Sequence, residues 1–384
     1  MKILFVCNEY PPSPHGGIGT FVRTLARQLA ARGTPVAVVG YALGLQADSL
    51  DDDRGVRVYR LADPYRRFGP VKVGRYAFDL LDLPRRLYLS QRVDQIAVLE
   101  NSDLVESYDW SGPLGRKTHA PLVMRLHGAN SAYAFYENRK PGFGLKQRES
   151  ANIAMADRLV AVSRHIGEIT AAAMGRALPF EVIYNGVDTR VFSPGMGDVD
   201  ADQILYVGSV TRRKGIYELL KAAALILPAR PETYFTFVGN LSEMERLQVE
   251  IALNDLAPMW QEKFHFIGRV PHQQLPEYYR QAAVVVFPSL AEAFGLTCVE
   301  AMACGKAVAA TTLASGPELV EHERSGLLAD PTRPKEFAAA VLRLLEDASL
   351  ADQLGRAARE RTLALFNLQD LAERNLAFYR EVLS

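Results

Sequence analysis

One stretch of the chain, between residues 284 and 305, restricts the fold more than any other. It opens with Val284–Phe287, a short and largely β-branched run that is typical of a buried parallel strand. A loop follows, and a helix is predicted from about Leu296 to Gly305, where glycine can adopt the left-handed conformation that ends a helix. The first N–H groups of such a helix have no partner within it, and together with the helix dipole they attract anions. The stretch therefore predicts an α/β fold with an anion site beyond a buried strand.

Two carboxylates flank this predicted anion site, Glu292 in the loop and Glu300 inside the helix. A carboxylate repels a nearby phosphate, whereas it readily accepts hydrogen bonds from sugar hydroxyls. The combination indicates a ligand with hydroxyl groups on both sides of a phosphate, which describes a nucleotide-sugar. The alternative is a pair of surface glutamates on an ordinary strand–loop–helix unit.

Residues 292–305, Glu-Ala-Phe-Gly-Leu-Thr-Cys-Val-Glu-Ala-Met-Ala-Cys-Gly, resemble the donor-site signature of the family 4 retaining glycosyltransferases. This resemblance covers nearly the whole chain and is most specific from Val182 onward. It implies the GT-B fold, an α/β architecture of two Rossmann-like domains that face each other across a cleft. It also implies that Glu292 holds hydroxyls of the donor sugar and that Glu300 holds those of the ribose. Four further residues of the signature are expected at the donor: Phe294, Gly295, Leu296 and Thr297.

Short apolar runs alternate with helical patterns in both halves of the chain, as in open α/β sheets. Strands are predicted in the first half at Ile3–Cys7, Val36–Val39, Val56–Leu61, Ile96–Leu99, Leu122–Leu126 and Leu159–Val162. They are predicted in the second half at Ile204–Val207, Tyr234–Val238, Phe264–Ile267, Val284–Phe287, Ala307–Ala310 and Gly326–Ala329. We place a first domain over 1–193 and a second over 194–366, which begins with a hinge at 194–203, and an amphipathic helix over 367–384. The family resemblance implies that the first is the acceptor-side domain, that the second is the donor domain and that the C-terminal helix returns to the first domain.

The first predicted strand is followed by a loop that contains Gly16 and Gly17. The dinucleotide pattern G-x-G-x-x-G is not met there, which disfavours a dehydrogenase. The glycine pair resembles that of the family, whose backbone amide approaches the donor diphosphate; a plain tight turn is the alternative. His127 follows the strand Leu122–Leu126, where the family has a histidine beside the reacting sugar. A lone histidine satisfied in the core is the alternative.

A basic loop, Thr211–Gly215, follows the first strand of the second half. Family members meet the charge of the leaving diphosphate with an Arg/Lys pair in this loop, and Lys214 matches the lysine. Many members have Gly-Arg at the start of the loop, where this chain has Ser209, so we assign the arginine to Arg213, with Arg212 as its rival. A solvated basic turn is the alternative. Farther on, the backbone of Val270 resembles the segment that holds the nucleobase.

Composition limits the partners. The 44 basic and 44 acidic residues give zero formal net charge, which argues against nucleic acid. Three cysteines without disulfide or metal-ligand spacing indicate a reducing compartment, so we predict a cytoplasmic protein. The acidic run Asp51–Asp53 lies far from the site motifs, and Lys214 with Arg213 can neutralise a diphosphate. We therefore expect no metal and no other cofactor.

The region between residues 60 and 92 is strongly basic and contains interleaved aromatic and aliphatic residues. Its charged residues are Arg60, Arg66, Arg67, Lys72, Arg75, Arg85, Arg86 and Arg92, against Asp63, Asp79 and Asp82. Such a segment suits peripheral contact with an anionic membrane, and the predicted location then includes the inner face of the membrane. We favour a helix that packs its apolar face on the first domain, because Pro70 and Pro84 should interrupt any long amphipathic helix.

The function expected from these observations is a retaining, metal-independent transfer of a hexose-type sugar from a nucleoside diphosphate to a hydroxyl acceptor. UDP is favoured over GDP. A product in a polysaccharide, glycolipid or other glycoconjugate is expected, and the sequence does not identify the acceptor. Two alternatives stay open, a nucleotide-sugar epimerase of the same fold and a non-catalytic protein that binds nucleotide-sugars.

Overall fold

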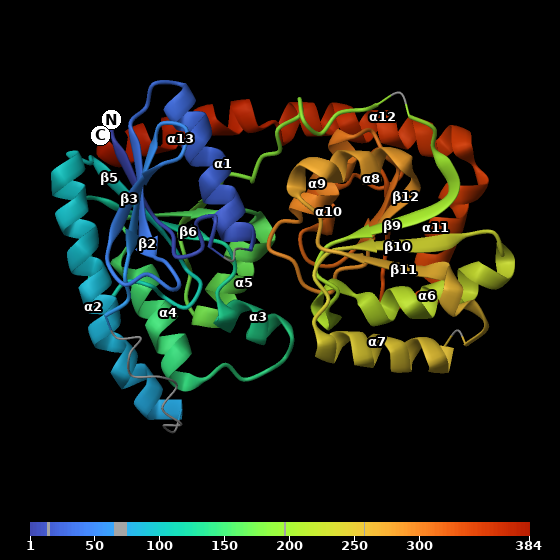
Figure 1. Ribbon diagram of the computed structural model, residues 1–384, viewed down its shortest axis with the longest axis horizontal. Coiled ribbons are helices and arrows are strands. Elements are labelled where there is room, and N and C mark those ends of the chain that lie inside the picture. Colours follow the sequence, from blue (N-terminus) through green and yellow to red (C-terminus); the bar gives the residue numbers. More distant parts are fainter. Residues whose placement is uncertain (14–15, 65–74, 196, 257) are drawn as a thin grey trace. The chain divides into compact units, whose positions relative to one another are not determined.

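The structure is a computed structural model that describes residues 1–13, 16–64, 75–195, 197–256 and 258–384. The chain divides into two compact units. The first consists of Met1–Asn185 and Leu368–Ser384, and the second of Gly186–Asn367. Each unit is a largely parallel sheet with helices packed on it, so the predicted α/β class is confirmed (Figure 1).

The first unit has a sheet in the order β3-β4-β2-β1-β5-β6-β7-β8, in which only the β3–β4 pairing is antiparallel among the described strands. The strands are β1 Ile3–Val6, β2 Val36–Tyr41, β3 Ser49–Asp52, β4 Val56–Leu61, β5 Leu104–Tyr108, β6 Leu122–Leu126, β7 Arg158–Ala161 and β8 Phe180–Val182. The helices are α1 Gly17–Ala31, α2 Arg75–Glu100, α3 Asn130–Tyr136, α4 Phe143–Met155, α5 Arg164–Met174 and α13 Leu368–Leu383.

The second unit has a sheet in the order β11-β10-β9-β12-β13-β14, with every described pairing parallel. The strands are β9 Asp200–Val207, β10 Tyr234–Val238, β11 Phe264–Gly268, β12 Ala282–Phe287, β13 Val308–Thr311 and β14 Leu327–Ala329. The helices are α6 Ile216–Ala229, α7 Glu243–Leu256, α8 Leu275–Gln281, α9 Leu296–Ala303, α10 Gly316–Leu319, α11 Pro334–Glu346 and α12 Ala348–Leu365. Short 3₁₀ turns occur at η2 Arg212–Lys214, η3 Pro258–Lys263 and η4 His272–Gln274. Helices cover both faces of this sheet, with α6 and α7 on one side and α8 and α9 on the other (Figure 1).

The chain crosses between the units after Asn185, whereas the sequence analysis placed the boundary after residue 193. The segment that follows Asn185 belongs to the second unit because its backbone is bound there. Val187 N–H donates to Phe366 O at 3.0 Å, and the Arg359 guanidinium donates to the carbonyls of Thr189 and Phe192. The predicted hinge, 194–203, therefore lies inside the second unit, and its last residues begin β9.

Most predicted strands are present, but the strand predicted at Ile96–Leu99 is wrong. These residues form the end of α2, and the neighbouring strand is β5, which begins at Leu104. The expected interruption at Pro84 is wrong as well, since α2 continues through it. Pro84 is exposed, so water can hydrate the carbonyl that its missing N–H leaves without a partner. Pro70 lies outside the described residues.

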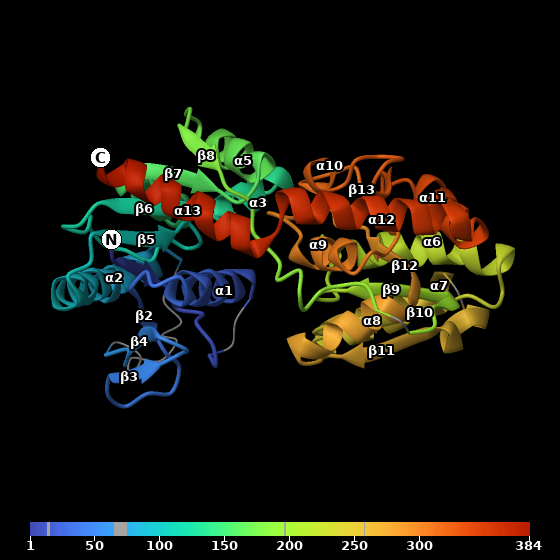
Figure 2. The ribbon, with the colours of Figure 1, turned by 90° about the horizontal axis from the view of Figure 1, so that it is seen from above.

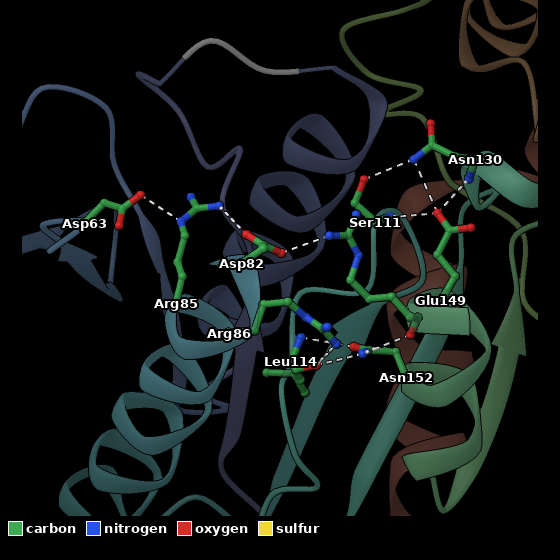
Figure 3. Close-up of polar contacts among 10 residues, drawn as sticks. Asp63, Asp82, Arg85, Arg86, Ser111, Leu114, Asn130, Glu149 and Asn152 are labelled. Carbon is green, nitrogen blue, oxygen red and sulfur yellow. Dashed lines mark hydrogen bonds and ion pairs between the residues drawn. The ribbon is translucent and has the colours of Figure 1, made fainter. Parts of the chain in front are cut away.

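The arginines of the basic region whose side chains are described make contacts within the first unit. Arg85 binds Asp63 at 2.7 Å and lies over the ring of Tyr41, and the Arg86 guanidinium donates to Leu114 O at 2.5 Å (Figure 3). Two more arginines are paired, Arg60 with Asp51 and Arg92 with Asp48. These contacts agree with the packing interpretation. Arg66, Arg67 and Lys72 lie outside the described residues, the side chain of Arg75 is not described, and membrane contact stays a prediction. Within the part of the chain that the structure describes, no helix has the length and apolar character needed to cross a bilayer.

Helix α13 is fastened to the first unit by a buried polar cluster. It lies beside α1 and shares the hydrophobic core of the sheet (Figure 2). Beneath it, the fully buried Arg125 guanidinium donates to Glu106 at 2.7 and 3.1 Å and to the Asn375 amide oxygen at 2.5 Å. The Tyr379 hydroxyl donates to the same carboxylate at 2.7 Å. A buried charge needs all of these partners, so the cluster fixes where α13 docks.

We expect Tyr379→Phe to destabilise the first unit by about 1.5–3 kcal/mol, because it removes a buried hydrogen bond to a charged group. Urea unfolding measures the change. Arg374→Ala is the matched control, since Arg374 lies on the exposed face of the same helix and should alter stability by less than about 0.5 kcal/mol. Equal stability of the two variants would contradict the role given to the cluster.

Candidate active site

Two loops of the second unit meet where its strand order reverses. β9, the first strand of this sheet in the chain, pairs with β10 on one side and β12 on the other. The connections that leave the C-terminal ends of β9 and β12 run to opposite sides, which opens a crevice between them in folds of this kind. The basic loop with Lys214 follows β9, and the loop with Glu292 follows β12. The basic loop and the Glu292 loop, both predicted from sequence, thus lie where open α/β sheets commonly bind ligands.

The two loops are joined through their backbones. The carbonyl of Arg213 accepts from Leu290 N at 2.9 Å and from Ala291 N at 3.2 Å. Gly215 ends the basic turn with φ +75°, and a Cβ atom there would lie 1.8 Å from the carbonyl oxygen of Pro288. Only glycine permits this close approach. The loops therefore form one preorganised wall.

Lys214 and Glu292 form an ion pair across this wall. Both side chains are largely buried, at 22% and 19% exposure. Arg213 is partly buried and Arg212 is exposed, and the choice of Arg213 as the partner of a diphosphate stays a prediction. The wall thus holds a cation and a carboxylate in direct contact beside the first turn of α9.

Glu300 lies in α9 and is only 4% exposed. One carboxylate oxygen contacts the His272 ring nitrogen at 2.7 Å, and the other accepts from the Tyr279 hydroxyl at 3.0 Å. The His272 ring also packs against Phe192, with ring centroids 5.0 Å apart. Burial lowers the pKa of His272, but the adjacent Glu300 carboxylate outweighs it and raises the pKa above its usual value. The sequence analysis missed His272 and Tyr279; the only signal for His272 was its place two residues after Val270.

The remaining donor-site predictions lie around the same edge of the sheet. Gly295 precedes α9 with φ +98°, and a small pocket is lined by Glu292, Phe294, Gly295 and Thr297 among others. Leu296 is the first residue of α9, Ser209 is exposed after β9, and Val270 follows β11. The structure therefore brings Phe294, Gly295 and Thr297 to Glu292, while the roles given to all of these residues stay predictions.

The first unit has its own point of strand-order reversal, between β1 and β5. Gly17 begins α1 in the connection that leaves β1, and Gly16 N–H donates to the Glu9 carboxylate at 3.1 Å. His127 directly follows β6, and its partly buried ring packs edge-on against Phe21 at 5.1 Å. Burial, together with the nearby Arg125 charge, lowers the pKa of His127 to about 3. The imidazole is therefore neutral at physiological pH.

Two buried carboxylates hold the loops at this edge, and the sequence analysis identified neither. Asp109, after β5, accepts from the backbone N–H of His127 at 2.9 Å and of Gly128 at 3.2 Å. Glu149, in α4, accepts from the backbone N–H of Ser111 at 3.0 Å and of Asn130 at 2.9 Å (Figure 3). Burial raises the pKa of Asp109 to about 7, and the charge of Glu149 adds to the effect. Each is an isolated acidic residue in the sequence, and no sequence motif indicates that it binds the backbone of a distant loop.

Comparison with known proteins assigns the chain to a family. The model for Glycosyltransferase Family 4 matches residues 15–191, and that for Glycosyl transferases group 1 matches residues 197–361. A D-inositol 3-phosphate glycosyltransferase of Acidothermus cellulolyticus is 30% identical, over 96% of this chain and 86% of its own. The chain is a family 4 glycosyltransferase. A glycogen synthase of Mycobacterium tuberculosis is 26% identical to this glycosyltransferase, over 99% of this chain and 94% of its own.

Solved structures confirm the GT-B fold class of this family 4 glycosyltransferase. Sucrose-phosphate synthase from Thermosynechococcus elongatus superimposes with a TM-score of 0.84 at 26% identity, over 99% of this chain and 98% of its own. The Anabaena protein HepE in complex with UDP-glucose superimposes with a TM-score of 0.75 at 20% identity, over 99% of this chain and all of its own. Among the described residues of the glycosyltransferase, no cluster of three or more His, Cys, Asp or Glu side chains could hold a metal ion.

The raised pKa of Asp109 predicts a pH-dependent stability. In the unfolded chain this carboxyl ionises with a pKa of about 4, whereas in the folded unit it does so at about 7. The folded state therefore loses stability as pH rises through this window. Between pH 5 and 8 the wild type should lose about 2–3 kcal/mol relative to Asp109→Asn, at 1.36 kcal/mol per pH unit. Urea unfolding of both proteins at several pH values checks this, and parallel pH profiles would contradict it.

Proposed function

We propose that the protein is a retaining glycosyltransferase that moves a hexose-type sugar from UDP to a hydroxyl acceptor without a metal ion. The observation that carries the proposal is the joined wall at the β9–β12 reversal, where Lys214 and Glu292 are paired just before the start of α9, the helix that carries Glu300. Such an arrangement offers a cation and free helix N–H groups to a diphosphate and carboxylates to hydroxyls. The crystallised complex of HepE with UDP-glucose supports a UDP-sugar donor.

In the proposed reaction, the bond between the anomeric carbon and the diphosphate oxygen breaks while the acceptor oxygen bonds to the same face of that carbon. The acceptor hydroxyl proton passes to the leaving diphosphate, so no protein nucleophile is required. Negative charge grows on the diphosphate as its bond breaks, and Lys214 with Arg213 is placed to stabilise it. Once Lys214 binds the diphosphate, Glu292 is free to accept from sugar hydroxyls.

The direct test is transfer from a panel of UDP- and GDP-linked hexoses to sugars and polyols in excess chelator. We expect a glycoside with the anomeric configuration of the donor, UDP as the second product, and full activity in chelator because cationic side chains replace the metal. An epimerised donor without acceptor would instead identify an epimerase, and donor binding without turnover would identify a binding protein. Activity that requires added Mg²⁺ or Mn²⁺ would overturn the metal-free assignment.

Lys214→Ala should lower kcat by about 10²–10³-fold, as loss of a group that stabilises developing charge does. The donor KM should change much less, because the charge that Lys214 meets is largest in the transition state. Lys221→Ala is the matched control, since Lys221 is an exposed lysine of the neighbouring helix α6. Comparison of Arg213→Ala with Arg212→Ala shows which arginine acts. A normal kcat for Lys214→Ala would refute the assigned role.

A further inference from the structure

A second set of side chains lies at the strand-order reversal of the first unit. The loop that leaves β5 begins with Asp109, Trp110 and Ser111, and β5 is flanked by β1 and β6 in the sheet. Ligands of open α/β sheets bind beyond the carboxyl ends of the strands at such reversals. Neither the family signature nor the donor wall of the second unit uses this loop.

Two buried carboxylates hold the backbone of this loop in one conformation. The Glu149 carboxylate, which is completely buried, accepts from the backbone N–H groups of Ser111, Asn130 and Ser131 at 2.9–3.0 Å. Asp109 ties the same loop to the segment that follows β6. Ser111 has φ +58°, a left-handed conformation that this backbone contact maintains. Two loops from neighbouring strands are thereby fixed as one surface.

This surface has unused hydrogen-bonding capacity. The Asn130 side-chain N–H₂ donates to the Ser111 hydroxyl oxygen at 3.0 Å and to Glu149 at 3.3 Å. Its amide oxygen points away from both of these partners (Figure 3). Both side chains are partly exposed. An acceptor atom on Asn130 and a hydroxyl proton on Ser111 are therefore available to a ligand.

Trp110 gives the surface an apolar face. The indole is partly exposed, and Tyr133 of α3 supports it edge-on at 6.1 Å between ring centroids. A rigid aromatic ring beside a few fixed polar groups is typical of small-molecule sites, and it suits the C–H face of a pyranose. Two arginines of the same region are ion-paired, Arg85 with Asp63 and Arg148 with Asp82. The polar side chains of the surface itself, Ser111 and Asn130, are neutral and match hydroxyls.

We infer that Trp110, Ser111 and Asn130 form the subsite for a sugar acceptor, with the pyranose ring stacked on Trp110 and its hydroxyls bonded to Ser111 and Asn130. The inference rests on the proposed function and specifies the acceptor class. The ligand of this subsite is the ring of a sugar or sugar phosphate.

The chain offers a direct probe, because Trp110 and Trp260 are its two tryptophans. Trp260→Phe, a change in the second unit outside the predicted site, leaves Trp110 as the sole reporter. Glucose, methyl α-glucopyranoside, fructose 6-phosphate and inositol are titrated into this variant in the presence of UDP. We expect the sugars that serve as acceptors to change Trp110 emission saturably. The reciprocal variant, Trp110→Phe with Trp260 retained, should give no signal.

Asn130→Ala in the Trp260→Phe background should weaken the apparent affinity for the same sugar about fivefold, as loss of one neutral hydrogen bond does. It should raise the acceptor KM equally and leave the donor KM and UDP affinity unchanged, which also shows that the variant is folded. Three results would overturn the inference. They are an acceptor that supports transfer but does not change Trp110 emission, an acceptor KM that Asn130→Ala leaves unchanged, and transfer only to lipids or peptides. Absence of both UDP binding and transfer would instead defeat the proposed function.

Discussion

The reversal of strand order at the centre of each sheet is the constraint on which both sites depend. Where connections leave neighbouring strands toward opposite faces, no helix covers the ends of those strands, and loops alone fill the space. In the second unit these are the loops after β9 and β12, and in the first unit those after β1 and β5. The residues proposed to act in the two candidate sites therefore lie mostly on loops, while the helices and strands beneath them supply the rigidity that a loop lacks on its own.

In the wall formed by the loops after β9 and β12, which is proposed to bind the donor, the charged side chains satisfy one another. An isolated carboxylate that is largely removed from water is costly, and so is an isolated ammonium group. Lys214 and Glu292 neutralise each other, and Glu300 is satisfied by His272 and Tyr279. When a donor binds, its diphosphate would replace Glu292 as the partner of Lys214, and its hydroxyls would become the partners of the carboxylates. The charged side chains would then change partners, and none of them would be left unpaired. The same pairing keeps both side chains near the positions in which they are proposed to act.

Sequence predicted the features that local pattern determines. The apolar runs gave most strands, Gly305 ended the expected helix, and residues 292–305 gave the family. Features that depend on distant contacts were not predictable. The run Ile96–Leu99 is apolar enough for a strand, but it completes a helix that begins more than twenty residues earlier. His272 meets Glu300 from a separate element, and Asp109 and Glu149 gain their roles only when two loops and α4 come together.

The two sites satisfy their carboxylates by opposite means, and this difference follows from what each site has to do. In the donor wall the partners are side chains, whose charges can be redistributed when a charged ligand binds. In the first unit most partners of Asp109 and Glu149 are backbone N–H groups, which cannot be moved without moving the loop. Such contacts hold a backbone in place, and burial of the carboxylate raises the pKa of Asp109 even though these N–H groups lower it. The neutral side chains of Ser111 and Asn130 are left partly exposed. A ligand recognised there gains from rigidity and hydroxyl geometry rather than from charge, which is the requirement for selecting one hydroxyl among the several that a sugar carries.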